Sequence, residues 1–186
     1  MRRAGLLITA SICCYFLLTS CEAENYVSRK YPCSFVLNTA LHLTCKLVQA
    51  LDESNHFTKV SVSSRGGVYQ VNSSDNYGNT EVVTLTTDKE NYAYTNGIHL
   101  GAGNLLIIGQ TSFNGILAYD GTCPNCNGNP ELSWTNNATQ VKCDRCGRVY
   151  DLNTGGIVSG AKDENNSLMR YIVAYSGRGS VLNVHN

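Results

Sequence analysis

The prediction of this fold begins from two short cysteine motifs, Cys-Pro-Asn-Cys at 123–126 and Cys-Asp-Arg-Cys-Gly at 143–147. The first motif follows an apolar segment at 116–119, and the second precedes a segment at 148–152 that contains valine, tyrosine and leucine. Short runs of this composition are typical of β-strands. The sequence therefore predicts two loops at strand ends, each with two thiols, separated by sixteen residues.

The spacing of these thiols is that of a four-thiolate metal site. A two-residue spacer lets one tight turn direct both sulfurs at the same ion, and Gly147 permits the second turn to close. Four thiolates fill a tetrahedron, so a zinc ion held here is expected to be structural rather than catalytic. Three basic residues beside the second turn either offset the excess negative charge or form a solvated loop edge; they are Lys142, Arg145 and Arg148. The predicted ligands are Cys123, Cys126, Cys143 and Cys146.

Several species suit this ligand set. A structural zinc ion, an all-cysteine 2Fe-2S cluster and a single iron in a rubredoxin-like cage all accept four thiolates. Two disulfides are the alternative if an oxidising compartment pairs the thiols before metal binds. Thiol-disulfide exchange at Cys123 and Cys126 is disfavoured, because the expected strand-then-helix context that lowers a thiol pKa is missing around this pair.

The rest of the chain predicts an all-β domain. Seventeen glycines, eleven tyrosines and only two methionines suit short strands joined by turns. Apolar residues at 43, 47, 48 and 51 have helical spacing and predict one short helix near the N-terminus. The continuous apolar run at 105–108 predicts a strand buried on both faces. Antiparallel strands are further expected at 34–37, 57–62, 68–71, 82–86, 116–119, 148–152, 157–158, 168–175 and 181–184.

A wider segment around the cysteines resembles the cluster-binding core of the Rieske family. The resemblance rests on Tyr-Asp-Gly-Thr-Cys-Pro at 119–124 and on Cys-Gly-Arg-Val-Tyr-Asp-Leu-Asn-Thr-Gly at 146–155. The family pattern has a Cys-Pro-His loop, a Cys-x-x-His-Gly loop, an aromatic-Asp strand and a Thr-Gly turn. The similarity covers about residues 103–186 and extends to a group of Rieske-like bacterial lipoproteins. It implies Rieske-like antiparallel β-sheets with two metal-binding hairpin loops.

The family's histidine ligands are replaced in this chain. Cys123 and Cys143 match the two family cysteines, and Cys146 stands at the position of the second-loop histidine. Asn125 occupies the place of the first-loop histidine, with Cys126 one residue further on. Histidine ligation of one iron raises the reduction potential of a Rieske cluster. A cluster in this chain is therefore expected to have the lower potential of all-cysteine clusters. Two hypotheses follow. The first is a structural or binding module whose fold is stabilised by a bound metal, and the second is an electron-transfer protein with an all-cysteine 2Fe-2S cluster.

The N-terminus predicts a lipoprotein signal peptide over residues 1–20. Two arginines precede a short apolar run, and Leu-Thr-Ser-Cys at 18–21 resembles the bacterial lipobox. Cys21 is therefore the predicted lipid anchor, acylated with chains such as palmitate. Residues 21–32 are expected to be a tether, and residues 33–186 a single domain with its metal-binding core at about 103–186. A plain secretory peptide or an uncleaved anchor is the alternative.

Charge and composition limit the classes of partner that this chain is expected to bind. The net charge is zero and no basic face is evident, so nucleic acid is not expected to bind. The expected partner is the membrane, through the lipid, in the cell envelope at the outer membrane, on the periplasmic or the exposed side. A redox or surface protein partner is left open, and Trp134 is expected either to dock it or to cover the metal site.

No catalytic constellation is recognised. The chain has no nucleophile elbow, no HExxH and no phosphate-binding loop, so an enzyme is not the favoured hypothesis. The four histidines share no ligand spacing. Cys33 and Cys45 are a candidate disulfide, with buried free thiols as the alternative.

Overall fold

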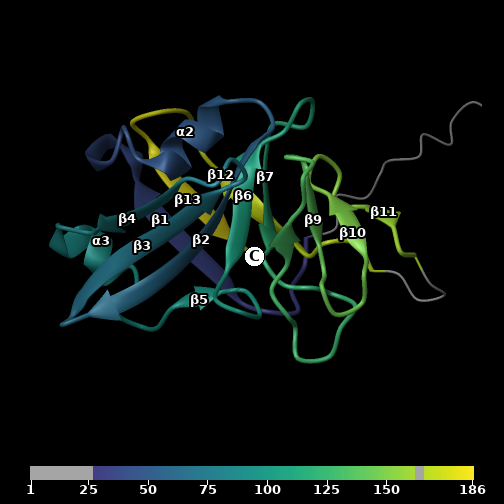
Figure 1. The fold of residues 1–186 in the computed structure, drawn as a ribbon. Coiled ribbons are helices and arrows are strands. Elements are labelled where there is room, and N and C mark those ends of the chain that lie inside the picture. Colours follow the sequence, from purple (N-terminus) through teal and green to yellow (C-terminus); the bar gives the residue numbers. More distant parts are fainter. Residues whose placement is uncertain (1–26, 162–165) are drawn as a thin grey trace, which may run out of the picture.

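The computed structural model describes residues 27–161 and 166–186, and within them the predicted all-β class is confirmed (Figure 1). A large sheet is built from β1 (Cys33–Asn38), β2 (His56–Arg65), β3 (Val68–Asp75), β4 (Thr80–Thr84), β5 (His99–Leu100), β6 (Leu106–Gln110), β7 (Ile116–Asp120), β12 (Arg170–Ala174) and β13 (Val181–His185). A small sheet contains β8 (Ser133–Trp134), β9 (Gln140–Lys142), β10 (Val149–Asp151) and β11 (Ile157–Ser159).

All pairs in both sheets are antiparallel, as the alternation predicts. The strand order is β4-β3-β2-β6-β7-β12-β13-β1-β5 in the large sheet and β11-β10-β9-β8 in the small one. The segment 103–186 supplies β6, β7, β12 and β13, which lie next to one another at the centre of the large sheet, and also the whole small sheet. The segment 33–100 adds strands on both sides of this centre.

The helix predicted near the N-terminus is α2 (Lys46–Asp52), which buries Leu47, Val48 and Leu51. Two further short helical segments, a 3-10 helix at Thr39–Leu41 and α3 (Asp88–Tyr92), were not predicted. The side chain of Thr87 caps α3 by accepting from the Glu90 N–H. Because α3 is short and buries only Glu90, it has no apolar periodicity for a sequence pattern to detect.

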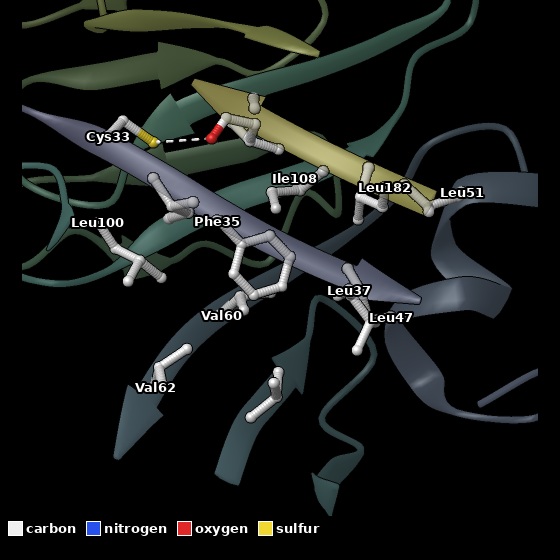
Figure 2. Close-up of a cluster of buried hydrophobic side chains, with 14 of the residues drawn as sticks. Cys33, Phe35, Leu37, Leu47, Leu51, Val60, Val62, Leu100, Ile108 and Leu182 are labelled. Atoms are coloured by element: carbon white, nitrogen blue, oxygen red, sulfur yellow. Dashed lines mark hydrogen bonds between the residues drawn. The ribbon is translucent and has the colours of Figure 1, made fainter. Parts of the chain in front are cut away.

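The central strands of the large sheet are buried on both faces. On one face, Leu106 and Ile108 pack in a cluster with Phe35 and residues of α2 (Figure 2). On the other face, Ile107 packs with Phe57 and with residues of the small sheet. Leu106, Ile107 and Ile108 are all fully buried, which confirms the prediction for these residues, whereas Leu105 is half-buried and precedes the strand. The two sheets therefore share a core through the second face.

The N-terminal part of the described chain is attached to the domain. Val27 pairs with Arg170 in an isolated parallel bridge, and the Ser28 N–H donates to the Arg170 carbonyl at 2.8 Å. The Asn186 side chain donates to the carbonyls of Ser28 and Tyr31 at 2.8 and 2.7 Å. Residues 27–32 are assigned to the tether because of their polar composition. Their backbone N–H and C=O groups are nevertheless hydrogen-bonded to the domain, which composition does not reveal. The predicted signal peptide (1–20), Cys21 and the tether up to residue 26 lie outside the described residues.

The candidate disulfide between Cys33 and Cys45 is not formed; both are buried free thiols. Cys33 opens β1 and points its Sγ at the Val184 carbonyl, 3.6 Å away, whereas Cys45 immediately precedes α2 beyond the other end of that strand (Figure 2). The six residues of β1 span about 16 Å, and a disulfide needs Cα atoms within roughly 7 Å. The extended strand between the two positions keeps them apart.

Candidate metal centre

The four predicted ligands meet in one place. The Sγ atoms of the quartet, Cys123, Cys126, Cys143 and Cys146, all lie within 4.8 Å of one another. The close pairs join the two loops: Cys123 and Cys146 are 3.8 Å apart, and Cys126 and Cys143 are 3.7 Å apart. Cys123 and Cys143 are fully buried, and the other two are half-buried. This cluster is able to bind a metal.

The first cysteine loop connects the two sheets. It leaves β7 of the large sheet and closes on itself where the Cys123 N–H donates to the Pro130 carbonyl at 2.9 Å. Thr122 and Glu131 form an antiparallel bridge at its base. The chain then enters β8 of the small sheet, so the loop sits where the sheets meet.

The second cysteine loop joins β9 to β10. The Cys143 N–H donates to the Arg148 carbonyl, and the Gly147 N–H donates to the Cys143 carbonyl, both at 2.9 Å. Gly147 has a φ of 73°, a left-handed conformation that glycine adopts without strain. Because β9 also pairs with β8, the strand that follows the first loop, the sheet register brings the two loops face to face.

The thiols differ in charge. Burial raises the pKa of Cys146, but hydrogen bonds from the backbone and guanidinium of Arg148 outweigh burial and lower that pKa to about 6. Burial and the neighbouring thiols raise the pKa of Cys126 to about 12. Burial also raises the pKa of Cys123. The hydrogen bonds from Arg148 thus favour the thiolate form of Cys146, which is the form that binds a metal.

Only one of the three expected basic residues touches a thiol. Arg148, 6% exposed, hydrogen-bonds to Cys146. Arg145 instead donates to the Asn127 carbonyl in the first loop, and Lys142 pairs with Asp144 at 3.0 Å. Of the two alternatives, direct charge compensation is therefore observed for Arg148, whereas Arg145 and Lys142 have other partners.

A tyrosine and an asparagine support the first loop. The Tyr150 hydroxyl lies 3.3 Å from the Cys123 sulfur and accepts a hydrogen bond from the Asn125 side chain at 2.9 Å. Asn125 also donates to the Asn166 carbonyl at 2.7 Å and accepts from the Asn166 N–H at 2.8 Å. Asn125 thus fastens the loop to two other segments.

Sequence reasoning gave Tyr150 and Asn166 no role at the site. Arg148, Tyr150 and Leu152 are all buried, which is the alternation of one strand face. That period-two pattern after Gly147 would have placed Tyr150 beside the cysteines. Asn166 carries no comparable signal, because its contact is set by the path of the chain between β11 and β12.

The other candidate residues lie outside the cluster. His42 pairs with Glu90, and His56 lies between Glu53 and Asp75. Trp134 is half-buried and packs against the core cluster that contains Cys123 and Cys143, with the Lys59 ammonium 5.5 Å from the centre of its ring. Over the described ranges, 27–161 and 166–186, the quartet is the metal-ligand group that the side chains form.

No family model, curated protein or solved structure matches the chain. Among the described helices, none has the length and apolar character needed to cross a membrane.

Proposed function

We propose that this chain is a lipid-anchored, extracytoplasmic module with a Rieske-like fold, in which one zinc ion held by four cysteines fixes the two loops to each other. Its role is structural or binding rather than catalytic. The observation that carries the proposal is the mutual spacing of the four sulfurs, all within 4.8 Å.

The spacing supports a single ion. Zinc-sulfur bonds of about 2.3 Å in a tetrahedron place neighbouring sulfurs about 3.8 Å apart. The two sulfur–sulfur contacts between the loops, 3.7 and 3.8 Å, have this length. In an all-cysteine 2Fe-2S cluster, the thiolates on different irons are roughly 5 to 6.5 Å apart, because two irons and their bridging sulfides stand between them. The sulfurs here are closer than that.

The location of the ligands supports a structural ion. Cys123 follows β7 of the large sheet, while Cys143 lies between β9 and β10 of the small sheet. An ion bound to both would link two sheets that otherwise share a side-chain core and are connected by the chain itself. Four protein ligands leave no coordination position for a substrate.

The second candidate function is electron transfer through an all-cysteine 2Fe-2S cluster. It is favoured by the Rieske-like residues around the loops and by the contact of the Tyr150 hydroxyl with the Cys123 sulfur, since hydrogen bonds to cluster sulfurs tune the potential. The sulfur spacing weighs against it. A single rubredoxin-like iron fits the spacing as zinc does.

Metal analysis with an absorption spectrum separates these functions. We expect the chain, expressed with its N-terminal segment and purified without oxygen, to be colourless and to contain one zinc per chain. Replacement of the zinc by cobalt is expected to give the strong visible bands of tetrahedral cobalt thiolate. Two irons with acid-labile sulfide would establish the cluster instead, and one iron without sulfide would establish the rubredoxin-like site.

The lipid anchor requires its own test. We expect the wild-type chain produced in a bacterial host to incorporate labelled palmitate and to partition into detergent, whereas Cys21→Ala incorporates none. Cys13→Ala and Cys14→Ala are matched controls, because they remove a cysteine from the same segment and leave the lipobox intact. Labelling of the Cys21→Ala variant, or an unlabelled wild-type chain, would contradict the anchor and leave the metal site unaffected.

A further inference from the structure

A polar cavity of about 370 Å³ lies beside the first cysteine loop. One side is formed by residues 124–129 of that loop, and the other by Lys30 and Tyr31 of the N-terminal segment, with Arg148 and Asn166 completing the wall. Among residues 27–161 and 166–186, the lining contains two cations, several amides, a phenol and the Cys126 thiol, and no carboxylate. The two cations can bind an anion, although the neighbouring thiolates oppose it.

The two cations have different settings. Arg148 is buried and already hydrogen-bonded to Cys146, so its guanidinium is fixed in the wall. Lys30 is exposed, with its ammonium 5.3 Å from the centre of the Tyr31 ring. Within residues 27–161 and 166–186, no acidic side chain forms a salt bridge with Lys30. One fixed and one adjustable cation thus border the same space.

Neutral groups in the wall add a donor. The Tyr31 hydroxyl accepts a hydrogen bond from the Asn129 side chain at 2.9 Å, which leaves its own O–H to donate. Asn125 has its amide occupied by Tyr150 and Asn166, so it shapes the wall and holds it rigid. The donors come from two segments, Lys30 and Tyr31 from the N-terminal one and Arg148 from the residue before β10, and they border one cavity.

We propose that this cavity binds a phosphate group, carried by a small molecule or by a lipid head group. A tetrahedral oxyanion accepts hydrogen bonds from several directions, which suits donors on separate walls better than a planar carboxylate does. The cavity is larger than a phosphate ion, so a short carbon skeleton also fits. The proposal that a lipid head group supplies the phosphate depends on the proposed lipid anchor. That anchor would hold the cavity near the membrane, since Lys30 follows Cys21 by only nine residues. The excess negative charge of a four-thiolate metal site keeps the expected affinity for inorganic phosphate weak, about millimolar.

The test is a titration of the metal-loaded full chain with inorganic phosphate, in micelles of an uncharged detergent, followed by backbone amide NMR shifts. We expect saturable shifts at residues 29–31, 125–129 and 148, and no such shifts with sodium chloride at equal ionic strength. Lys30→Gln is expected to weaken binding about fivefold or more. Lys89→Gln is the matched control, because it removes the same charge from an exposed lysine of α3, at the far end of the large sheet (Figure 1).

Shifts that do not saturate, or equal weakening by Lys30→Gln and Lys89→Gln, would overturn the proposal. Metal content measured in each variant separates this failure from failure of the metal site. A chain that keeps its metal and does not bind phosphate refutes only the proposal that the cavity binds a phosphate group. Phosphatidylglycerol added to the same micelles identifies the source. A head-group ligand reproduces the shifts without inorganic phosphate, whereas a free small molecule is indicated if only inorganic phosphate produces them.

Discussion

Cys143→Ser is expected to release the metal and to lower the melting temperature by about 10 °C or more. Cys143 is fully buried, and its sulfur lies 3.7 Å from that of Cys126, so serine removes one of four ligands from the centre of the site. Metal held by native ligands contributes its binding free energy to folding, and losing several kcal/mol moves the melting temperature of a domain of this size by about 2–4 °C per kcal/mol. Thermal melts followed by circular dichroism, with metal analysis, measure both effects.

Cys45→Ala is the control for removal of a buried thiol. Cys45 is 5% exposed and lies outside the quartet, so its replacement is expected to retain the metal and to cost about 1 kcal/mol, the value typical of a small cavity. A Cys143→Ser chain that keeps one metal ion and melts with the wild type would refute the structural role of the site.

Asp120→Ala is expected to lower the free energy of unfolding by roughly 3–5 kcal/mol. Asp120 ends β7, three residues before Cys123, and is completely buried. Its carboxylate accepts from the Ala102 N–H at 2.6 Å and from the Tyr171 hydroxyl at 3.0 Å. It also accepts from the Thr122 N–H at 2.9 Å and from the Thr122 hydroxyl at 2.5 Å. Alanine leaves these donors buried without an acceptor.

Urea denaturation of the metal-loaded protein measures this loss. Asp120→Asn keeps one acceptor oxygen and is expected to cost less than alanine. Asp88→Ala, at an exposed position in α3, is the control and is expected to change stability by about 0.5 kcal/mol or less. If Asp120→Ala unfolds within about 1 kcal/mol of the wild type, the carboxylate is not the anchor of the first loop that its hydrogen bonds indicate.

The strands with strong alternation or long apolar runs were predictable from sequence. β2, β6 and β13 are examples, because burial of one or both faces requires apolar residues at fixed positions along the chain. β5, β8 and β9 were not predicted. They contain two or three residues each, too few for a periodic pattern, and they exist because a neighbouring strand supplies their hydrogen bonds.

The predictions that required knowledge of chain path were less successful. The candidate disulfide between Cys33 and Cys45 failed, since sequence separation does not reveal that an extended strand lies between the two thiols. Residues 27–32 read as a polar tether, yet backbone groups that are the same in every sequence hold them to β12 and to Asn186.

The sequence alone determined the four candidate metal ligands and the class of the fold. A Cys-x-x-Cys turn is local, because its two sulfurs are directed by a few backbone angles, and strand alternation is likewise a local consequence of burying one face. Only the tertiary structure decided which groups surround the ligands. The contact between Arg148 and Cys146, the support of Cys123 by Tyr150, and the cavity between Lys30 and the first loop all join segments through sheet pairing and chain path. Those are non-local interactions, set by the packing of the whole domain.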